Sequence, residues 1–253
     1  MAKLKLLYFL PLIFGLISVI SISINGLFFF IFMILSMISF VFVWKPAYKL
    51  LILAAIIGAS LEIINLKTGG FLVGMYRYNM YPLLLGVIPI QIIIWWAITL
   101  YISYTAISAF FKNKIINLFL VPLLASLFEL VNEPVSVHLH IITWLVKDKI
   151  ISWYGIPWTN FAGLYVGAFI IMALFYLLTR KRKDQPQPTN KIIKAYPLLY
   201  LSYTFVYFIL FINSSIRAPV EYGFLIILVT FTILCASKYK AIKQLLMSYE
   251  EED

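Results

Sequence analysis

Long apolar stretches separated by short polar segments dominate the chain of 253 residues. A helix needs about 20 apolar residues to cross the hydrocarbon core of a bilayer, because each residue advances it by about 1.5 Å. The pattern predicts eight such helices, over residues 6–24, 26–43, 48–66, 83–110, 115–133, 158–178, 196–212 and 222–237. We therefore expect an all-α integral membrane protein with about eight transmembrane helices.

The composition agrees with this fold class. Hydrophobic residues make up 63% of the chain and charged residues only 12%, whereas a soluble domain is roughly a quarter charged. The net charge of +10 would suggest nucleic-acid binding in a soluble protein, but here the basic residues lie in short segments between apolar spans. We read them as a topology signal and expect no nucleic-acid partner.

The basic residues predict which way the chain is threaded. Cytoplasmic loops of membrane proteins are enriched in Lys and Arg. With the N-terminus inside and eight crossings, the outer face receives few of the 20 Lys and Arg residues, namely Lys67, Arg77, Lys147, Lys149 and Arg217. The opposite orientation would invert this bias. We predict a multi-pass protein of the cell membrane with both termini in the cytoplasm.

One polar segment divides the chain. Residues 180–194 are basic, contain two prolines and lack apolar periodicity, which is typical of a linker. This predicts a six-helix membrane core over 1–179 that carries the site, the cytoplasmic linker, two further transmembrane helices over 195–240, and an acidic cytoplasmic tail over 241–253. No convincing internal repeat is visible, which argues against a transporter built from inverted halves.

Four acidic residues lie in or beside the apolar spans, in the half of the protein predicted to be non-cytoplasmic: Glu62, Glu129, Glu133 and Asp148. Burying a carboxyl group at membrane depth costs several kcal/mol unless the group is paired or protonated. Such residues are therefore functional candidates, and we select Glu62, Glu129 and Glu133 as catalytic.

Glu129 and Glu133 are four residues apart, which places both carboxyl groups on one helix face beside Asn132. Pro134 follows directly and is expected to disrupt the helix there. The pattern favours a paired acid site. The alternative is that Glu133 is solvated at the membrane interface while Glu129 bonds to a neighbouring helix.

Two predicted outer loops, residues 68–82 and 153–161, are rich in Gly, Pro and aromatic residues. Many of these rings have an alternative explanation as interfacial anchors. An arginine between two tyrosines, and an asparagine at the start of the sixth helix, are placed to bind acidic or hydroxyl groups. The substrate-binding candidates from these loops are Tyr76, Arg77, Tyr78, Trp153, Tyr154 and Asn160.

Metal ligands are sparse. His138 and His140 follow the acid pair, but two histidines one residue apart point in different directions, and no His-Glu-x-x-His motif is present. Cys235 is the single cysteine. We expect neither a metal nor a cofactor, and a metal-dependent membrane enzyme using the histidines is a weaker alternative.

The order of motifs over roughly residues 55–170 resembles the membrane-bound carotenoid biosynthesis family that includes the gamma-carotene and bisanhydrobacterioruberin hydratases. In the first block an acid, Glu62, precedes Thr68-Gly69, then Gly74-Met-Tyr76-Arg-Tyr78 and Gly86-Val-Ile-Pro89. The second block has two acids four apart, then Pro134, Trp144 and Tyr154-Gly-Ile-Pro-Trp-Thr-Asn-Phe-Ala-Gly163.

This resemblance implies a cofactor-independent hydratase that adds water to a terminal double bond of a carotenoid. Glu129 or Glu133 would protonate the alkene, while the other carboxylate, or Glu62, would hold and deprotonate the water. Aromatic faces would stabilise the tertiary carbocation, and Asn160 would orient a carboxyl group or the water. The partners would be a lipophilic isoprenoid, water and membrane lipid, with the substrate entering laterally from the bilayer.

The rival interpretation is a proton-coupled transporter or a lipid-binding membrane protein in which the same three glutamates relay protons or bind a cation. The two readings predict different cavities. A cavity open to lipid favours the hydratase, and a water-lined path open to both sides of the membrane favours transport.

Overall fold

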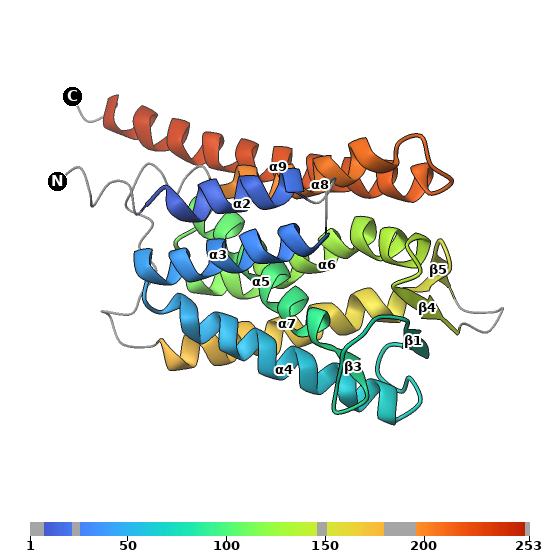
Figure 1. The fold of residues 1–253 in the computed structure, drawn as a ribbon. Helices are drawn as coiled ribbons and strands as arrows, with labels where there is room; N and C mark the ends of the chain where they lie inside the picture. Colours follow the sequence, from blue (N-terminus) through green and yellow to red (C-terminus); the bar gives the residue numbers. More distant parts are fainter. Residues whose placement is uncertain (1–7, 22–25, 146–150, 180–195, 251–253) are drawn as a thin grey trace.

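The computed structural model describes residues 8–21, 26–145, 151–179 and 196–250, with side chains as far as residue 237. Eight α-helices lie within these residues and run back and forth as a bundle (Figure 1). They are α2 (Leu10–Ser21), α3 (Gly26–Val43), α4 (Ala47–Lys67), α5 (Ile90–Phe110), α6 (Lys114–His138), α7 (Trp158–Leu178), α8 (Tyr196–Phe211) and α9 (Arg217–Glu250).

Six of these helices are long and apolar enough to cross a membrane: α3 to α7, and the part of α9 over Arg217–Ser237. This confirms a multi-pass, all-α membrane protein. The helices α2 and α8 are apolar but only 12 and 16 residues long, so eight complete crossings remain a prediction. The start of α2 and the end of α9 lie at the same end of the bundle (Figure 1). Which membrane face that end occupies is also a prediction.

Two predicted helices have different bounds in the structure. Residues 83–89 form a short strand hairpin, and the fourth predicted helix begins only at Ile90. The last helix begins at Arg217 rather than 222 and extends to Glu250, through most of the segment predicted as a separate tail. The predicted linker, residues 180–194, lies outside the described residues.

Three antiparallel strand pairs lie together at the end of the bundle opposite to the start of α2 (Figure 1). Strand β1 (Tyr76–Tyr78) pairs with β4 (Ile142–Trp144), with Arg77 opposite Thr143. The other two pairs are local hairpins, β2 (Leu83–Leu84) with β3 (Ile88–Pro89), and β5 (Ser152–Trp153) with β6 (Ile156–Pro157).

The order helix, strand, hairpin, helix occurs twice. The first unit, residues 47–110, is α4–β1–β2–β3–α5, and the second unit, residues 114–178, is α6–β4–β5–β6–α7. Within the units α4 packs on α5 and α6 on α7; between them α4 packs on α7 and α5 on α6. Exchanging the units preserves every one of these contacts, as well as the antiparallel β1–β4 pair. The core is therefore a repeat in which both copies run in the same direction, which the sequence does not reveal.

The two hairpins explain how α5 and α7 begin. The turn of the second hairpin places Tyr154 and Gly155 at φ of 50° and 86°, the left-handed conformation that tight hairpin turns require. Each hairpin ends in Ile-Pro, and the prolines, Pro89 and Pro157, are the N-caps of α5 and α7. Proline suits this place because it lacks the N–H that a helix start would leave unpaired.

The expectation that Pro134 ends its helix is wrong, since α6 continues to His138. A proline inside a helix removes the hydrogen bond to the carbonyl four residues earlier, which here is Leu130. The indole Nε1 of Trp153 donates to that oxygen at 3.0 Å. A side chain from β5 thus replaces the missing backbone donor, and Glu133 lies inside the helix rather than at its end.

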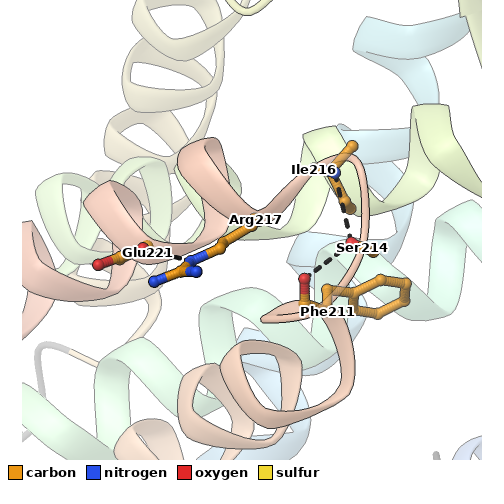
Figure 2. Close-up of polar contacts among 5 residues, drawn as sticks. All are labelled: Phe211, Ser214, Ile216, Arg217 and Glu221. Atoms are coloured by element: carbon orange, nitrogen blue, oxygen red, sulfur yellow. Dashed lines mark hydrogen bonds and ion pairs between the residues drawn. The ribbon is translucent and has the colours of Figure 1, made fainter.

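The turn between α8 and α9 closes the bundle beside α6 (Figure 2). Ser214 Oγ donates to the carbonyl oxygen of Phe211 at 2.7 Å and accepts from the backbone N–H of Ile216 at 3.3 Å. Arg217 and Glu221 form an ion pair at 3.1 Å in the first turn of α9, which is exposed and so contributes little stability. The turn ends α8 at Phe211, whose ring packs against His138 of α6.

Candidate functional site

A cavity of about 660 Å³ lies between the two units, lined by α4, α5, α6, α7 and β1, and it extends to α3 and α8. Its volume is in the range of small-molecule binding pockets. Most of the lining is apolar, but Glu62, Glu129 and Glu133 all line it. The fold therefore brings the three predicted catalytic acids into one cavity.

Glu62, near the end of α4, is held by three donors. The hydroxyl of Tyr76 donates to Oε2, the hydroxyl of Tyr78 donates to the same oxygen at 3.1 Å, and Trp96 Nε1 donates to Oε1 at 3.1 Å. Successive residues of a strand point to opposite faces, so residues 76 and 78 of β1 face the acid together. Both oxygens of this carboxyl group are occupied.

Burial and the neighbouring Glu62 raise the pKa of both phenols, Tyr76 and Tyr78, well above the ordinary value for tyrosine. Because a raised pKa keeps a phenol protonated, both hydroxyl groups are neutral at neutral pH. They therefore serve as donors to the acid.

Glu129 is 2% exposed, one side of its carboxyl group facing α5 and the other its own helix. Trp95 Nε1 donates to Oε1 at 3.2 Å, and Asn132 Nδ2 donates to Oε2 at 2.6 Å. The hydroxyl of Tyr207 on α8 donates to Asn132 Oδ1 at 3.3 Å. This bond from α8 fixes the orientation of the amide that holds the acid.

Glu133 is half-buried and has the fewest partners of the three acids. Trp144 Nε1 on β4 donates to Oε2 at 3.3 Å, and no hydrogen bond reaches Oε1 from the described residues. The side chain of Asn160 lies near the Glu133 carboxyl group and is oriented as a donor to it, without completing a hydrogen bond of normal geometry. Its amide nitrogen is buried without a hydrogen-bond partner among the described residues, and the side chain lines the cavity.

The cavity has an acidic character. The three carboxyl groups are close enough to interact electrostatically with one another. Among the described residues, no Lys, Arg or His lines the cavity. Because like charges repel strongly where little water screens them, the arrangement favours a set of acids that is only partly ionised.

A family model described as carotenoid biosynthesis protein matches residues 22–230. The chain belongs to the carotenoid biosynthesis protein family. The match spans both units, all three acids and helices α3 and α8, and so extends beyond the region 55–170 that carries the resemblance. No curated protein sequence and no solved structure matches the chain.

In this member of the carotenoid biosynthesis family, three of the predicted substrate-binding residues lie away from the cavity. Arg77 is exposed on the face of β1 opposite to the two tyrosines. Trp153 contacts the backbone of α6, and Tyr154 is 51% exposed in the hairpin turn. The remaining candidates, Tyr76, Tyr78 and Asn160, line the cavity.

The aromatic residues Trp95, Trp96 and Tyr207 also belong to the cavity, although they are not among the candidates predicted from the sequence. They lie inside apolar helices, where an aromatic residue is expected as core packing. A pair of neighbouring tryptophans more than one turn inside α5 is the only signal that could have drawn attention to them.

Across the residues that the structure describes, no three His, Cys, Asp or Glu residues are grouped so that they could hold a metal ion. The ring of His138 packs edge-to-face on Phe211, with 5.8 Å between centroids. Asp148 lies outside the described residues.

Proposed function

We propose that this protein is a hydratase that adds water to a terminal carbon–carbon double bond of a carotenoid or related isoprenoid. The observation that carries the proposal is the grouping of three carboxyl groups in an apolar cavity of a carotenoid biosynthesis protein. Alkene hydration needs a neutral acid, a carboxylate base and an apolar surface for the hydrocarbon chain, and all three are available there.

Exposed apolar residues in the lining of the cavity support entry of an apolar substrate. Val166 and Ile170, one turn apart in the middle of α7, line the cavity and are 55% and 41% exposed. They belong to a helix long and apolar enough to span the membrane, so their exposed faces meet lipid. A cavity reached through this face favours the hydratase over a transporter, which needs a path for water between both membrane faces.

The reaction balances with protein groups and water alone. The π electrons of the double bond take the acid proton onto the less substituted carbon, the acid O–H bond breaks, and a tertiary carbocation forms. A water oxygen then bonds to the cation and passes one proton to a carboxylate. The product is a tertiary alcohol, and no oxidant or reductant is consumed. Either Glu129 or Glu133 is the acid in this scheme.

The proposal is tested by mass spectrometry of pigments from a lycopene-producing host that expresses the protein. We expect products that have gained one water for each modified end. The double variant Glu129→Gln, Glu133→Gln should form at least about 100-fold less product, because general acid–base groups typically contribute 10²- to 10⁴-fold. Glu221→Gln, at the exposed ion pair of α9, is the matched control and should leave product formation unchanged.

Absence of any hydrated product from folded protein, with lycopene and with longer carotenoids, would contradict the hydratase and favour the transporter. Equal product from the double variant and the control would contradict the role of the acid pair.

A further inference from the structure

The three acids of the cavity differ in how completely their oxygens are hydrogen-bonded. From the described residues, Glu62 accepts three hydrogen bonds, Glu129 accepts two, and Glu133 accepts one, from Trp144 at 3.3 Å. The hydrogen bonds therefore indicate which of the acids is ionised and which carries a proton.

The contacts of Glu62 suit a carboxylate. An indole N–H can only donate, so Trp96 requires an acceptor at Oε1. Both phenol groups already donate to Oε2. If this carboxyl group were protonated, its O–H would need an acceptor. A tyrosine hydroxyl that turned to accept that hydrogen bond could no longer donate to Glu62.

The contacts of Glu133 suit a carboxylic acid. Its Oε1 has no hydrogen-bond partner among the described residues, and the side chain lines the cavity. A proton on Oε1 is therefore presented to whatever occupies the cavity. Glu129 lies one helical turn away on the same face of α6, within reach as a partner in proton exchange.

We propose, building on the hydratase function, that Glu62 with Tyr76, Tyr78 and Trp96 is a cation-binding subsite. Glu62 stays ionised throughout the reaction and holds the positive charge of the tertiary carbocation. The same subsite takes a quaternary ammonium group of similar shape. Glu133 is the proton donor, and Tyr76 and Tyr78 are positioning residues.

A second observation points to a ligand in the same cavity. Asn160 is only 8% exposed, and its buried amide nitrogen has no hydrogen-bond partner among the described residues. A buried donor without a partner is unfavourable, so this nitrogen, which lies beside Glu133, calls for an acceptor that a ligand brings, such as the oxygen of the attacking water. The carboxylate of Glu62 comes from the first unit, and the amide donor of Asn160 comes from the second. Together they suit a carbocation with a water oxygen beside it, which is the arrangement that forms during hydration.

The protons balance under this assignment. Glu133 loses its proton to the alkene carbon, and Glu129 takes one from the attacking water. Transfer of that proton from Glu129 to Glu133 restores the starting state. Glu62 gains and loses none.

The test measures binding of two probes to the purified full-length chain in detergent, independently of turnover. One is an isoprenoid chain ending in trimethylammonium, and the other is its neutral isostere ending in tert-butyl. We expect the protein to bind the ammonium probe at least about tenfold more tightly than the neutral probe. Glu62→Gln should abolish this preference, whereas Glu62→Asp should keep part of it and Glu133→Gln should keep it.

The tyrosines give a second set of variants. Tyr76→Phe and Tyr78→Phe should each reduce the preference by about threefold while binding of the neutral probe is unchanged. Tyr81→Phe is the matched control, because Tyr81 is 79% exposed, and it should behave as the unmodified protein. Thermal unfolding of each variant shows whether it is folded, and if Glu62→Gln does not fold, the two tyrosine variants decide.

A preference that survives in Glu62→Gln, or an unmodified protein that binds both probes equally, overturns the subsite. The pigment experiment separates this failure from failure of the hydratase. If hydrated carotenoid forms but the protein shows no preference for the ammonium probe, the hydratase function stands and the cation-binding subsite is wrong. If the protein shows a preference that depends on Glu62 but forms no hydrated product, the subsite stands and the hydratase function is wrong.

Discussion

The first and second units share one arrangement of helices and strands but hold their acids differently. The single acid of the first unit, Glu62, is bonded, among the described residues, by side chains of its own unit, from β1 and α5. The two cavity acids of the second unit draw on both units, because Trp95 of α5 bonds to Glu129 and Trp144 of β4 bonds to Glu133. A repeated scaffold thus supplies a fixed acid on one side and a less constrained pair on the other.

Helix α5 serves both units through two adjacent tryptophans. Neighbouring residues on a helix point about 100° apart, so Trp95 reaches Glu129 while Trp96 reaches Glu62. The equivalent helix of the second unit, α7, instead places Gly163 and Gly167 against the first unit. The missing side chains let Val73, Leu61 and Trp96 of the first unit pack closely against α7.

The largest effect is expected where α4 approaches the shared helix α5. A Cβ at Gly58 would lie 2.3 Å from the ring of Trp96, so Gly58→Ala should push the indole away from Glu62. We expect a loss of about 1 to 3 kcal/mol of stability, as is usual for overpacking, measured by thermal unfolding in detergent. Gly26→Ala is the control, since no atom lies within 4 Å of its added Cβ. Equal effects from both would show that α4 and α5 are not tightly packed there.

A smaller effect separates the two strand tryptophans of the second unit. Trp144→Phe removes the indole hydrogen bond to Glu133 and should lower hydrated product by about tenfold with little change in stability. Trp153→Phe leaves the carbonyl of Leu130 without its donor and should instead lower stability by about 1 kcal/mol, with less effect on product. Pigment analysis and thermal unfolding of both variants check this. The reverse pattern would mean that Trp144 supports the fold rather than the acid.

The smallest effect concerns the link from the second unit to α8. Tyr207→Phe removes a bond to Asn132 and should reduce product roughly threefold to tenfold, since a single hydrogen bond contributes about 0.5 to 1.5 kcal/mol. Tyr104→Phe is the same chemical change at a buried hydroxyl without a partner among the described residues. It should leave both product and stability unchanged or slightly raise stability. If the two variants behave alike, α8 does not help to position Glu129.

The sequence was sufficient to locate the helices because membrane spans are long, continuous and apolar. It failed at residues 83–89, where a short apolar strand pair cannot be distinguished from a helix by periodicity. The repeat was equally hidden, since the units share the order of their elements and the Ile-Pro starts of α5 and α7 but little else. The donor that allows α6 to continue through Pro134 could not be predicted either, because it comes from the second hairpin, which the sequence did not reveal.

The acids were predictable because a carboxyl group in an apolar span is conspicuous. Their partners were less so. Tyr76 and Tyr78 were selected together with Arg77, and only the strand β1 reveals that alternation turns the arginine outward. Trp96 and Tyr207 could not be selected, because an aromatic residue in an apolar helix does not reveal which neighbour it will face.

The bond from Trp153 to Leu130 also makes one segment of the chain depend on another. The carbonyl that Pro134 leaves without its helical donor is bonded by a side chain 23 residues later in the sequence, on the hairpin before α7. An unpaired carbonyl is costly in lipid, so the end of α6 is fully hydrogen-bonded only when that hairpin packs against it. The helix that carries Glu129 and Glu133 therefore relies on the neighbouring hairpin for part of its own backbone hydrogen bonding.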